Sequence, residues 1–141
     1  MHFENTLTIR RPPHEVFEYL AAFENVPRWN YAIVETHKTS EGPVGVGATY
    51  DQTRSIPSPA EETFTVTEFD PDHRLTINGD LGPFEGTLSY ELESVPEGTQ
   101  LTNRADLEGK GFAKVAAPLL GRRVGDAVAT NLQKLKEILE T

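Results

Sequence analysis

The sequence predicts an α+β fold in which a curved, seven-stranded antiparallel sheet wraps around one long C-terminal helix, with two short helices after the first strand. Three observations predict this arrangement. Residues 111–141 carry apolar side chains at the three- and four-residue spacing of one continuous helical face. Residues 31–108 show apolar and polar residues in alternation, with turn sequences such as Asp70-Pro-Asp and Pro96-Glu-Gly between the alternating stretches. A further alternating stretch and two short helical patterns lie ahead of them.

The first elements follow from alternation and from proline. Residues 3–10 alternate between apolar and polar side chains, as a half-buried strand does. Pro12 and Pro13 end this strand, and Pro13 suits the first turn of a short helix. The face of this helix that we expect to be buried is formed by Val16, Phe17, Leu20 and Ala21. A second short helix is predicted from Asn25, as its N-cap, to Trp29, the single tryptophan of the chain.

Six further strands are predicted between the turn sequences. They cover residues 31–38, 47–56, 62–69, 74–78, 84–93 and 99–108. In the third of these strands, Phe64 and Val66 share one side while Phe69 lies on the other. We therefore expect a β-bulge near Thr67 and Glu68, because one extra residue reverses the alternation.

The long C-terminal helix follows Gly109 and Gly111, which end the last strand. At about 1.5 Å per residue it spans on the order of 40 Å, the width of a small domain. Pro118 lacks an N–H donor and predicts a kink in the first half of the helix. Gly121 and Gly125 have no side chains to fill space, so we expect a thin wall beyond the kink.

Composition bounds the class of protein. The chain has 141 residues, enough for one domain over residues 1–141 with a sizeable core. It contains no cysteine, which excludes disulfides, zinc-thiolate sites and thiol nucleophiles. No apolar run approaches the roughly 20 residues that span a bilayer, so no membrane insertion is expected. The Met1 start shows no charged-then-apolar signal segment, so we expect a cytoplasmic location.

The charge of the chain is acidic and unevenly spread. A formal net charge of −9 argues against nucleic-acid binding, which depends on lysine and arginine neutralising phosphates. Residues 110–141 nevertheless hold six of the 13 basic residues and three of the 22 acidic ones. A mildly basic helix on an acidic sheet is an internal electrostatic match. We therefore interpret Arg122 and Arg123 as solvated side chains, with an anion site as the alternative.

Motifs of metal or nucleophile chemistry do not occur in the chain. Its histidines, which stand at no ligand spacing, are His2, His14, His37 and His73. Neither a His-Glu-x-x-His helix nor a Gly-x-Ser-x-Gly elbow occurs. The glycine-rich residues 42–47 lack the Lys-Ser/Thr ending of a phosphate-binding loop and lead into a strand, so they predict a hairpin loop.

Five segments, in this order, carry a resemblance to a known family. They are IRRPPHEVFEYL at residues 9–20, NVPRWN at 25–30, GVG at 45–47, VTEFDP at 66–71 and LKEILE at 135–140. The chain resembles the START-like (SRPBCC) superfamily, and within it the polyketide cyclase/dehydrase and lipid-transport group, across essentially its whole length. The resemblance implies a helix-grip fold with a deep cavity between sheet and helix that takes a hydrophobic small molecule. It implies no universal catalytic motif and no cofactor.

The inward side of the sheet supplies the candidate ligand contacts. Tyr90 and Asn103 are polar residues among apolar neighbours on adjacent strands, and they either face a ligand or bond each other, a loop or trapped water. Trp29 is interpreted as a residue of the cavity rim. The full set of candidate ligand-binding residues is Trp29, Tyr50, Arg54, Ile77, Phe84, Leu88, Tyr90, Asn103, Ala105, Ala116, Leu120 and Val124.

Arg54 shares a strand side with Tyr50, so it would lie near the cavity mouth, where an arginine suits a carboxylate or enolate. The alternative is an ion pair with Glu61 or Glu62 across the loop that follows. No aspartate or glutamate falls clearly on the inward face, and Asp51 is weakly placed, so the sequence predicts no strong general base.

Three functions remain open from the sequence. The first is binding of a hydrophobic or aromatic small molecule, lipid-like or polyketide-like, in the cavity. The second is a cofactor-free polyketide cyclase or dehydratase, with Tyr90 and Asn103 as donors to a developing enolate. The third is a module that binds a protein partner. In each case we expect the start of the long helix and the loop at residues 78–84 to open the cavity.

Overall fold

Seven antiparallel strands form one sheet in the computed structural model, which describes residues 1–111 and 113–141 and leaves out the side chains of residues 115–119. The strands lie in the order β1-β7-β6-β5-β4-β3-β2, so that the first strand pairs with the last. Their bounds are β1 His2–Ile9, β2 Ile33–Lys38, β3 Thr49–Arg54, β4 Ala60–Asp70, β5 Arg74–Leu81, β6 Phe84–Val95 and β7 Gly98–Gly109.

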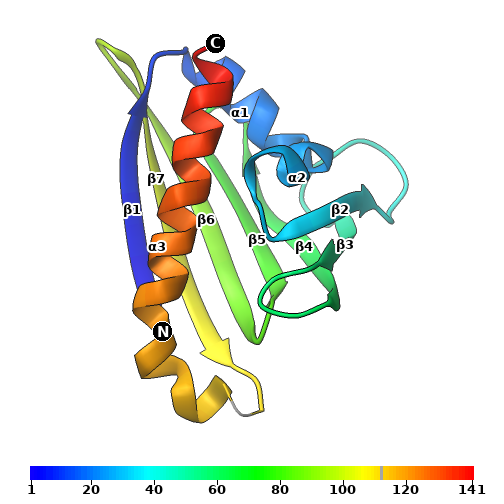
Figure 1. Cartoon of the computed structure of the whole chain (residues 1–141). Coiled ribbons are helices and arrows are strands. Elements are labelled where there is room, and N and C mark those ends of the chain that lie inside the picture. The colour runs from blue at the N-terminus through cyan, green and yellow to red at the C-terminus, as the bar shows by residue number, and fades with distance from the viewer. Residues whose placement is uncertain (112) are drawn as a thin grey trace.

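The helices cover one face of this sheet (Figure 1). Helix α1 spans Pro13–Ala21, a 3₁₀ turn spans Phe23–Asn25, α2 spans Val26–Trp29 and α3 spans Ala113–Leu139. Helix α3 runs along β1 and β7, α1 contacts β6 and β7, and α2 packs beside β2 (Figure 1). This is the predicted helix-grip fold. None of the described helices combines the length and the apolar character needed to cross a membrane.

The predicted bulge in β4 is confirmed, because the pairing of β4 with β5 changes register between Val66 and Glu68. The turn after β5 differs from the prediction. Strand pairing continues to Leu81, and Gly79 pairs with Gly86 on β6, so that only Gly82 and Pro83 remain between the two strands. The predicted loop at residues 78–84 is therefore a tight hairpin.

The two short helices form where the sequence predicts them, but the second is capped differently. The predicted face of α1 is buried in full. Asn25 precedes α2, yet its side chain makes no capping bond; its Nδ2 donates to the carbonyl of Tyr19 at 3.2 Å. A 3₁₀ turn places Asn25 in helical conformation already, which leaves its amide to tie α2 back to α1.

Two glycines allow the sheet to curve around the helices. A Cβ at Gly79 would stand 2.3 Å from the carbonyl oxygen of Thr63, and a Cβ at Gly86 would stand 2.2 Å from that of Asp106. Gly86 also has a φ of 149°, which side chains rarely adopt. Because Gly79 and Gly86 pair with each other across β5 and β6, the strands pack closely along one line there, which suits a curved sheet.

The glycines of α3 do not form the thin cavity wall that the sequence predicts. Gly121 and Gly125 face β1, where a Cβ would meet the side chains of Met1 and Phe3 respectively. Asn5 on the same strand donates from Nδ2 to the carbonyl of Gly125 at 3.4 Å. The glycines thus let β1 approach α3 closely instead of thinning a cavity wall. The kink predicted at Pro118 falls within residues 115–119, outside the described side chains.

Candidate functional site

A cavity of about 360 Å³ lies between the middle of α3 and the rim of the sheet. Four predicted residues line it: Arg54 at the end of β3, Phe84 at the start of β6, and Leu120 and Val124 on α3. The hairpin turn at Gly82 and the segment between α2 and β2 complete its mouth. We call this the outer cavity.

A smaller space of about 50 Å³ adjoins it, deeper under α2. Trp29, Ile77, Leu88 and Tyr90, all predicted, line this inner cavity. The two cavities share Asn30, Arg54 and Leu81 as lining residues, so they are adjacent, and together they are called here the α3 cavity.

Arg54 sits where the two cavities meet and is held by a buried polar network. Its Nε donates to Oε2 of Glu62 at 2.7 Å, and its Nη1 donates to the carbonyl of Ile56 at 3.3 Å. Oε1 of Glu62 accepts from Nε2 of Gln52 at 2.8 Å, and Oε2 also accepts from the backbone N–H of Gly82. The sequence offered a cavity position and an ion pair with Glu62 as alternatives for Arg54; both are present.

The expectation that no carboxylate lies on the inward face is wrong. Glu62 is 2% exposed and points inward from β4. The sequence did hold this signal, because Glu62 has the same strand parity as the apolar residues Phe64 and Val66. Both oxygens of Glu62 accept hydrogen bonds from protein donors, so this carboxylate orients Arg54 and does not line either cavity.

Trp29 and Tyr90 are the polar aromatic residues of the inner cavity. The rings of Trp29 and Tyr90 meet edge to face, with centroids 6.5 Å apart. Nε1 of Trp29 is fully buried and has no acceptor among the described residues. Burial raises the pKa of Tyr90 far above its ordinary value, so its hydroxyl remains protonated. Trp29 is thus at the inner end of the site and not at the rim that the sequence predicts.

Three candidate residues lie away from the α3 cavity. Asn103 is fully buried and donates from Nδ2 to the carbonyl of Ser89 at 3.3 Å, and with Ala105 it belongs to the packed core under α3. Tyr50 packs against Phe64 and lines a separate groove beside α1. A further candidate, Ala116, falls among residues 115–119, outside the described side chains.

The sequence reasoning missed the amides and the basic residue of the cavity mouth. Asn30 and Asn131 line the outer cavity, and Oδ1 of Asn131 accepts from the backbone N–H of Tyr31 at 3.4 Å. Arg123 also lines it, although Arg122 and Arg123 are both exposed as predicted. Asn131 lies one helical repeat of seven beyond Val124, a spacing that could have identified it.

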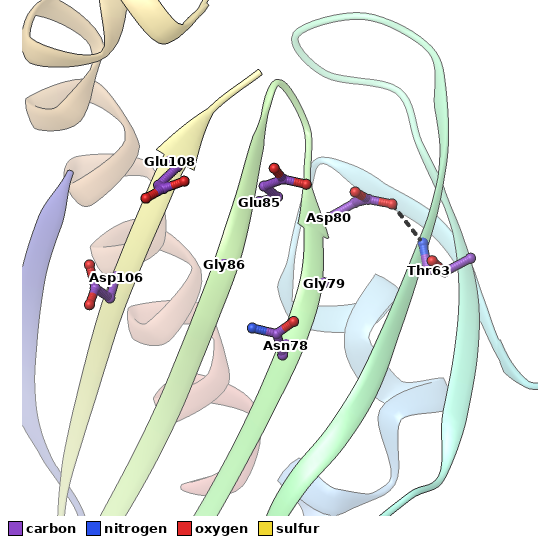
Figure 2. A pocket seen from close by; sticks show the side chains of 8 residues that line it. All are labelled: Thr63, Asn78, Gly79, Asp80, Glu85, Gly86, Asp106 and Glu108. Atoms are coloured by element: carbon purple, nitrogen blue, oxygen red, sulfur yellow. Dashed lines mark hydrogen bonds between the residues drawn. The ribbon is translucent and has the colours of Figure 1, made fainter. Parts of the chain in front are cut away.

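A separate hollow lies on the outer face of the sheet and is rimmed by carboxylates (Figure 2). Gly79 and Gly86 form part of its floor, between Asn78, Asp80, Glu85, Asp106 and Glu108. Asp80 on its edge accepts from the backbone N–H of Thr63 at 3.3 Å and from Lys110 Nζ at 3.0 Å. No group of three or more acidic or histidine side chains within the described part of the chain is placed to hold a metal ion.

Comparison with known families gives one match. The family model described as polyketide cyclase / dehydrase and lipid transport matches residues 1–140. No curated protein matches the chain.

Several solved structures share the fold. TTHA0849 from Thermus thermophilus superposes with a TM-score of 0.80 at 15% identity, over 97% of this chain and 95% of that one. The di-domain ARO/CYC StfQ from the steffimycin biosynthetic pathway gives a TM-score of 0.80 at 17% identity, over 99% of this chain and 50% of that one. Ara h 8.0201 gives a TM-score of 0.62 at 20% identity, over 96% and 97%. This chain therefore spans about half of the two-domain protein.

Proposed function

The chain belongs to the polyketide cyclase/dehydrase and lipid transport family, and from this premise we propose that it binds a hydrophobic or aromatic small molecule in the α3 cavity. The observation that carries the proposal is a pair of adjacent, mostly apolar cavities beside α3 and α2, with Arg54 lining both. Such sites are typical of small-molecule binding, since apolar walls supply affinity and a few fixed polar groups orient the ligand.

The dimensions favour a compact ligand. The outer cavity of about 360 Å³ lies near the small end of the roughly 300–1,000 Å³ found for ligand pockets. The inner cavity of about 50 Å³ has room for one polar substituent or one or two water molecules. A ligand of one or two rings fits this volume better than a long acyl chain does.

The polar groups favour a ligand that carries an oxygen acceptor. Trp29 and Tyr90 line the inner cavity, and Nε1 of Trp29 is a buried donor without an acceptor among the described residues, which is costly. Arg54 presents a guanidinium whose charge is already balanced by Glu62. A carbonyl or hydroxyl oxygen therefore suits the inner cavity.

The test uses Trp29 as a built-in reporter, because it is the only tryptophan in the chain and lines the inner cavity. We expect 8-anilinonaphthalene-1-sulfonate to bind and to accept excitation energy from Trp29. Ala127→Phe fills the outer cavity and should weaken binding about tenfold or more, whereas Ala129→Phe on the exposed side of the same helix should not. Equal affinity in the two variants would refute binding in the α3 cavity.

Cofactor-free cyclisation or dehydration of a polyketide is the second candidate. The observation that favours it is the convergence of Arg54 and Tyr90 on the inner cavity, where two donors could stabilise a developing enolate. Asn103, the other donor expected from the sequence, does not line the site. In this case Tyr90→Phe should slow turnover about tenfold to a thousandfold while Asn103→Leu acts only on stability. Unchanged product formation by Tyr90→Phe would remove the enzymatic role.

A further inference from the structure

A second concave site lies on the opposite side of the aromatic core from the α3 cavity. It is a groove of about 490 Å³ between α1, the β2–β3 connection and the β4–β5 turn. Phe17 and Ala21 of α1, Val44 of the connection and Phe69 of β4 form its apolar walls. Phe17 and Phe69 meet edge to face with centroids 5.3 Å apart. We call this the α1 groove.

An aromatic partition separates the groove from the α3 cavity. Tyr50 lines the groove, whereas Phe23 and Phe64 line the inner cavity. Tyr50 stacks on Phe64 with centroids 5.0 Å apart, and Phe23 meets Tyr50 edge to face at 4.8 Å. Because the three rings pack against one another, a ligand in one site does not reach the other.

The groove contains one tyrosine of the core as a polar lining residue. Tyr50 is 1% exposed and lines the groove. Burial and the nearby Glu24 carboxylate raise the pKa of Tyr50 to about 12, so the hydroxyl stays protonated at neutral pH. A protonated tyrosine hydroxyl can donate a hydrogen bond to a ligand or accept one from it.

The charged side chains around the groove are mainly acidic. Glu18, Glu24 and Asp72 line it. The single lysine of its lining, Lys38, directs its Nζ to the carbonyls of Ser40 and Gly42 in the connecting loop. His14 also lines the groove, with its Nδ1 3.1 Å from Oδ1 of Asp72. The rim therefore favours a cation, in line with the formal charge of −9 of the chain.

We propose that the α1 groove is a second binding site, for a small hydrophobic amine. The apolar part of the amine lies against Phe17, Phe69 and Val44. Its ammonium lies toward Glu24 and the Tyr50 hydroxyl, with the aromatic rings of the groove adding cation–π attraction. The groove is large enough for a ring and a short chain, and its occupant is independent of the ligand of the α3 cavity.

The experiment compares three probes that differ only in the polar group: 2-phenylethylammonium, 2-phenylethanol and phenylacetate. Amide chemical shifts in the ¹H–¹⁵N NMR spectrum report both affinity and location. We expect 2-phenylethylammonium to bind with a dissociation constant on the order of 1 mM and to shift α1 and the β2–β3 connection. We expect 2-phenylethanol to bind more weakly and phenylacetate most weakly.

Three variants locate the site. Glu24→Gln should weaken amine binding about threefold to fivefold, whereas Glu97→Gln, an equal charge change at the exposed β6–β7 turn, should not. Ala127→Phe blocks the outer cavity and should leave amine binding unchanged. Equal affinity for phenylacetate, no effect of Glu24→Gln, or loss of amine binding in Ala127→Phe would each overturn the proposal.

Discussion

The two halves of α3 do different work although they belong to one continuous helix. In the C-terminal half, Leu132 and Leu135 are almost fully buried, and Glu140 just beyond the helix accepts from the backbone N–H of Arg10 at 2.8 Å. In the other half, Leu120 and Val124 are only partly buried and form the wall of the outer cavity. One helix thus anchors the fold near its C-terminus and borders the site along its middle.

The largest loss of stability should come from removing a buried side chain in the C-terminal half of α3. Leu135→Ala removes a fully buried side chain and should lower the free energy of unfolding by about 2–5 kcal/mol. Val124→Ala, which faces a space that already exists, should cost about 1 kcal/mol or less. Urea unfolding of both variants measures the difference. Equal losses would mean that the two halves pack alike.

A smaller loss of stability is expected from a change in the polar network around Arg54. Glu62→Gln keeps the shape of the side chain but removes the charge that balances Arg54. We expect a loss of about 1–3 kcal/mol, moderated because Arg54 keeps the Ile56 carbonyl and borders the cavity. The matched exposed variant Glu61→Gln should be close to neutral in the same urea titration. If Glu62→Gln is also neutral, the network does not stabilise the fold.

Hydrogen exchange compares the two halves directly. Backbone amides of residues 113–121 should exchange at least about tenfold faster than those of residues 126–138, a difference of about 1.4 kcal/mol in opening free energy. The reason is that the second half is held by buried leucines and by bonds to β1, including Lys136 Nζ to the Thr8 carbonyl. Uniform protection along α3 would exclude opening of the cavity at the helix start.

The smallest effect is expected on the stability of the fold at alkaline pH. The fold keeps Tyr90 protonated, since burial raises its pKa above the ordinary value of 10.0. Above about pH 10 the unfolded chain therefore binds fewer protons than the folded one, so stability falls as pH rises. Tyr90→Phe should flatten this fall, and the exposed control Tyr31→Phe should not. Urea midpoints between about pH 9 and 12 give the slopes, and parallel slopes in wild type and Tyr90→Phe would contradict the argument.

Much of the fold could be predicted because its signals are local. Alternation indicated seven strands, and the change of side between Val66 and Phe69 located the bulge. The ends of elements were less predictable because they depend on pairing across the sheet. β5 continues beyond the predicted end at Asn78 as far as Leu81, because these residues pair with the start of β6, which the sequence alone does not place beside them.

The site was harder to predict because lining a cavity is a tertiary property. Strand parity places Ile77, Leu88 and Tyr90 inward, and these residues line the inner cavity. The same parity applies to Asn103, which points inward but lies in the packed core. Parity gives the side of the sheet and not the position along α3, which decides whether a residue meets the helix or the empty space beside it.

The close packing of strands at Gly79 and Gly86 affects the size of the inner cavity independently of the residues that line it. Any side chain at Gly79 would push against the backbone of Thr63 and Phe64, and Phe64 lines the inner cavity. The strands would have to straighten to make room, and the inner cavity would change shape with every lining residue still in place. Relatives with the same lining residues and a different residue at this line should therefore accept ligands of a different size.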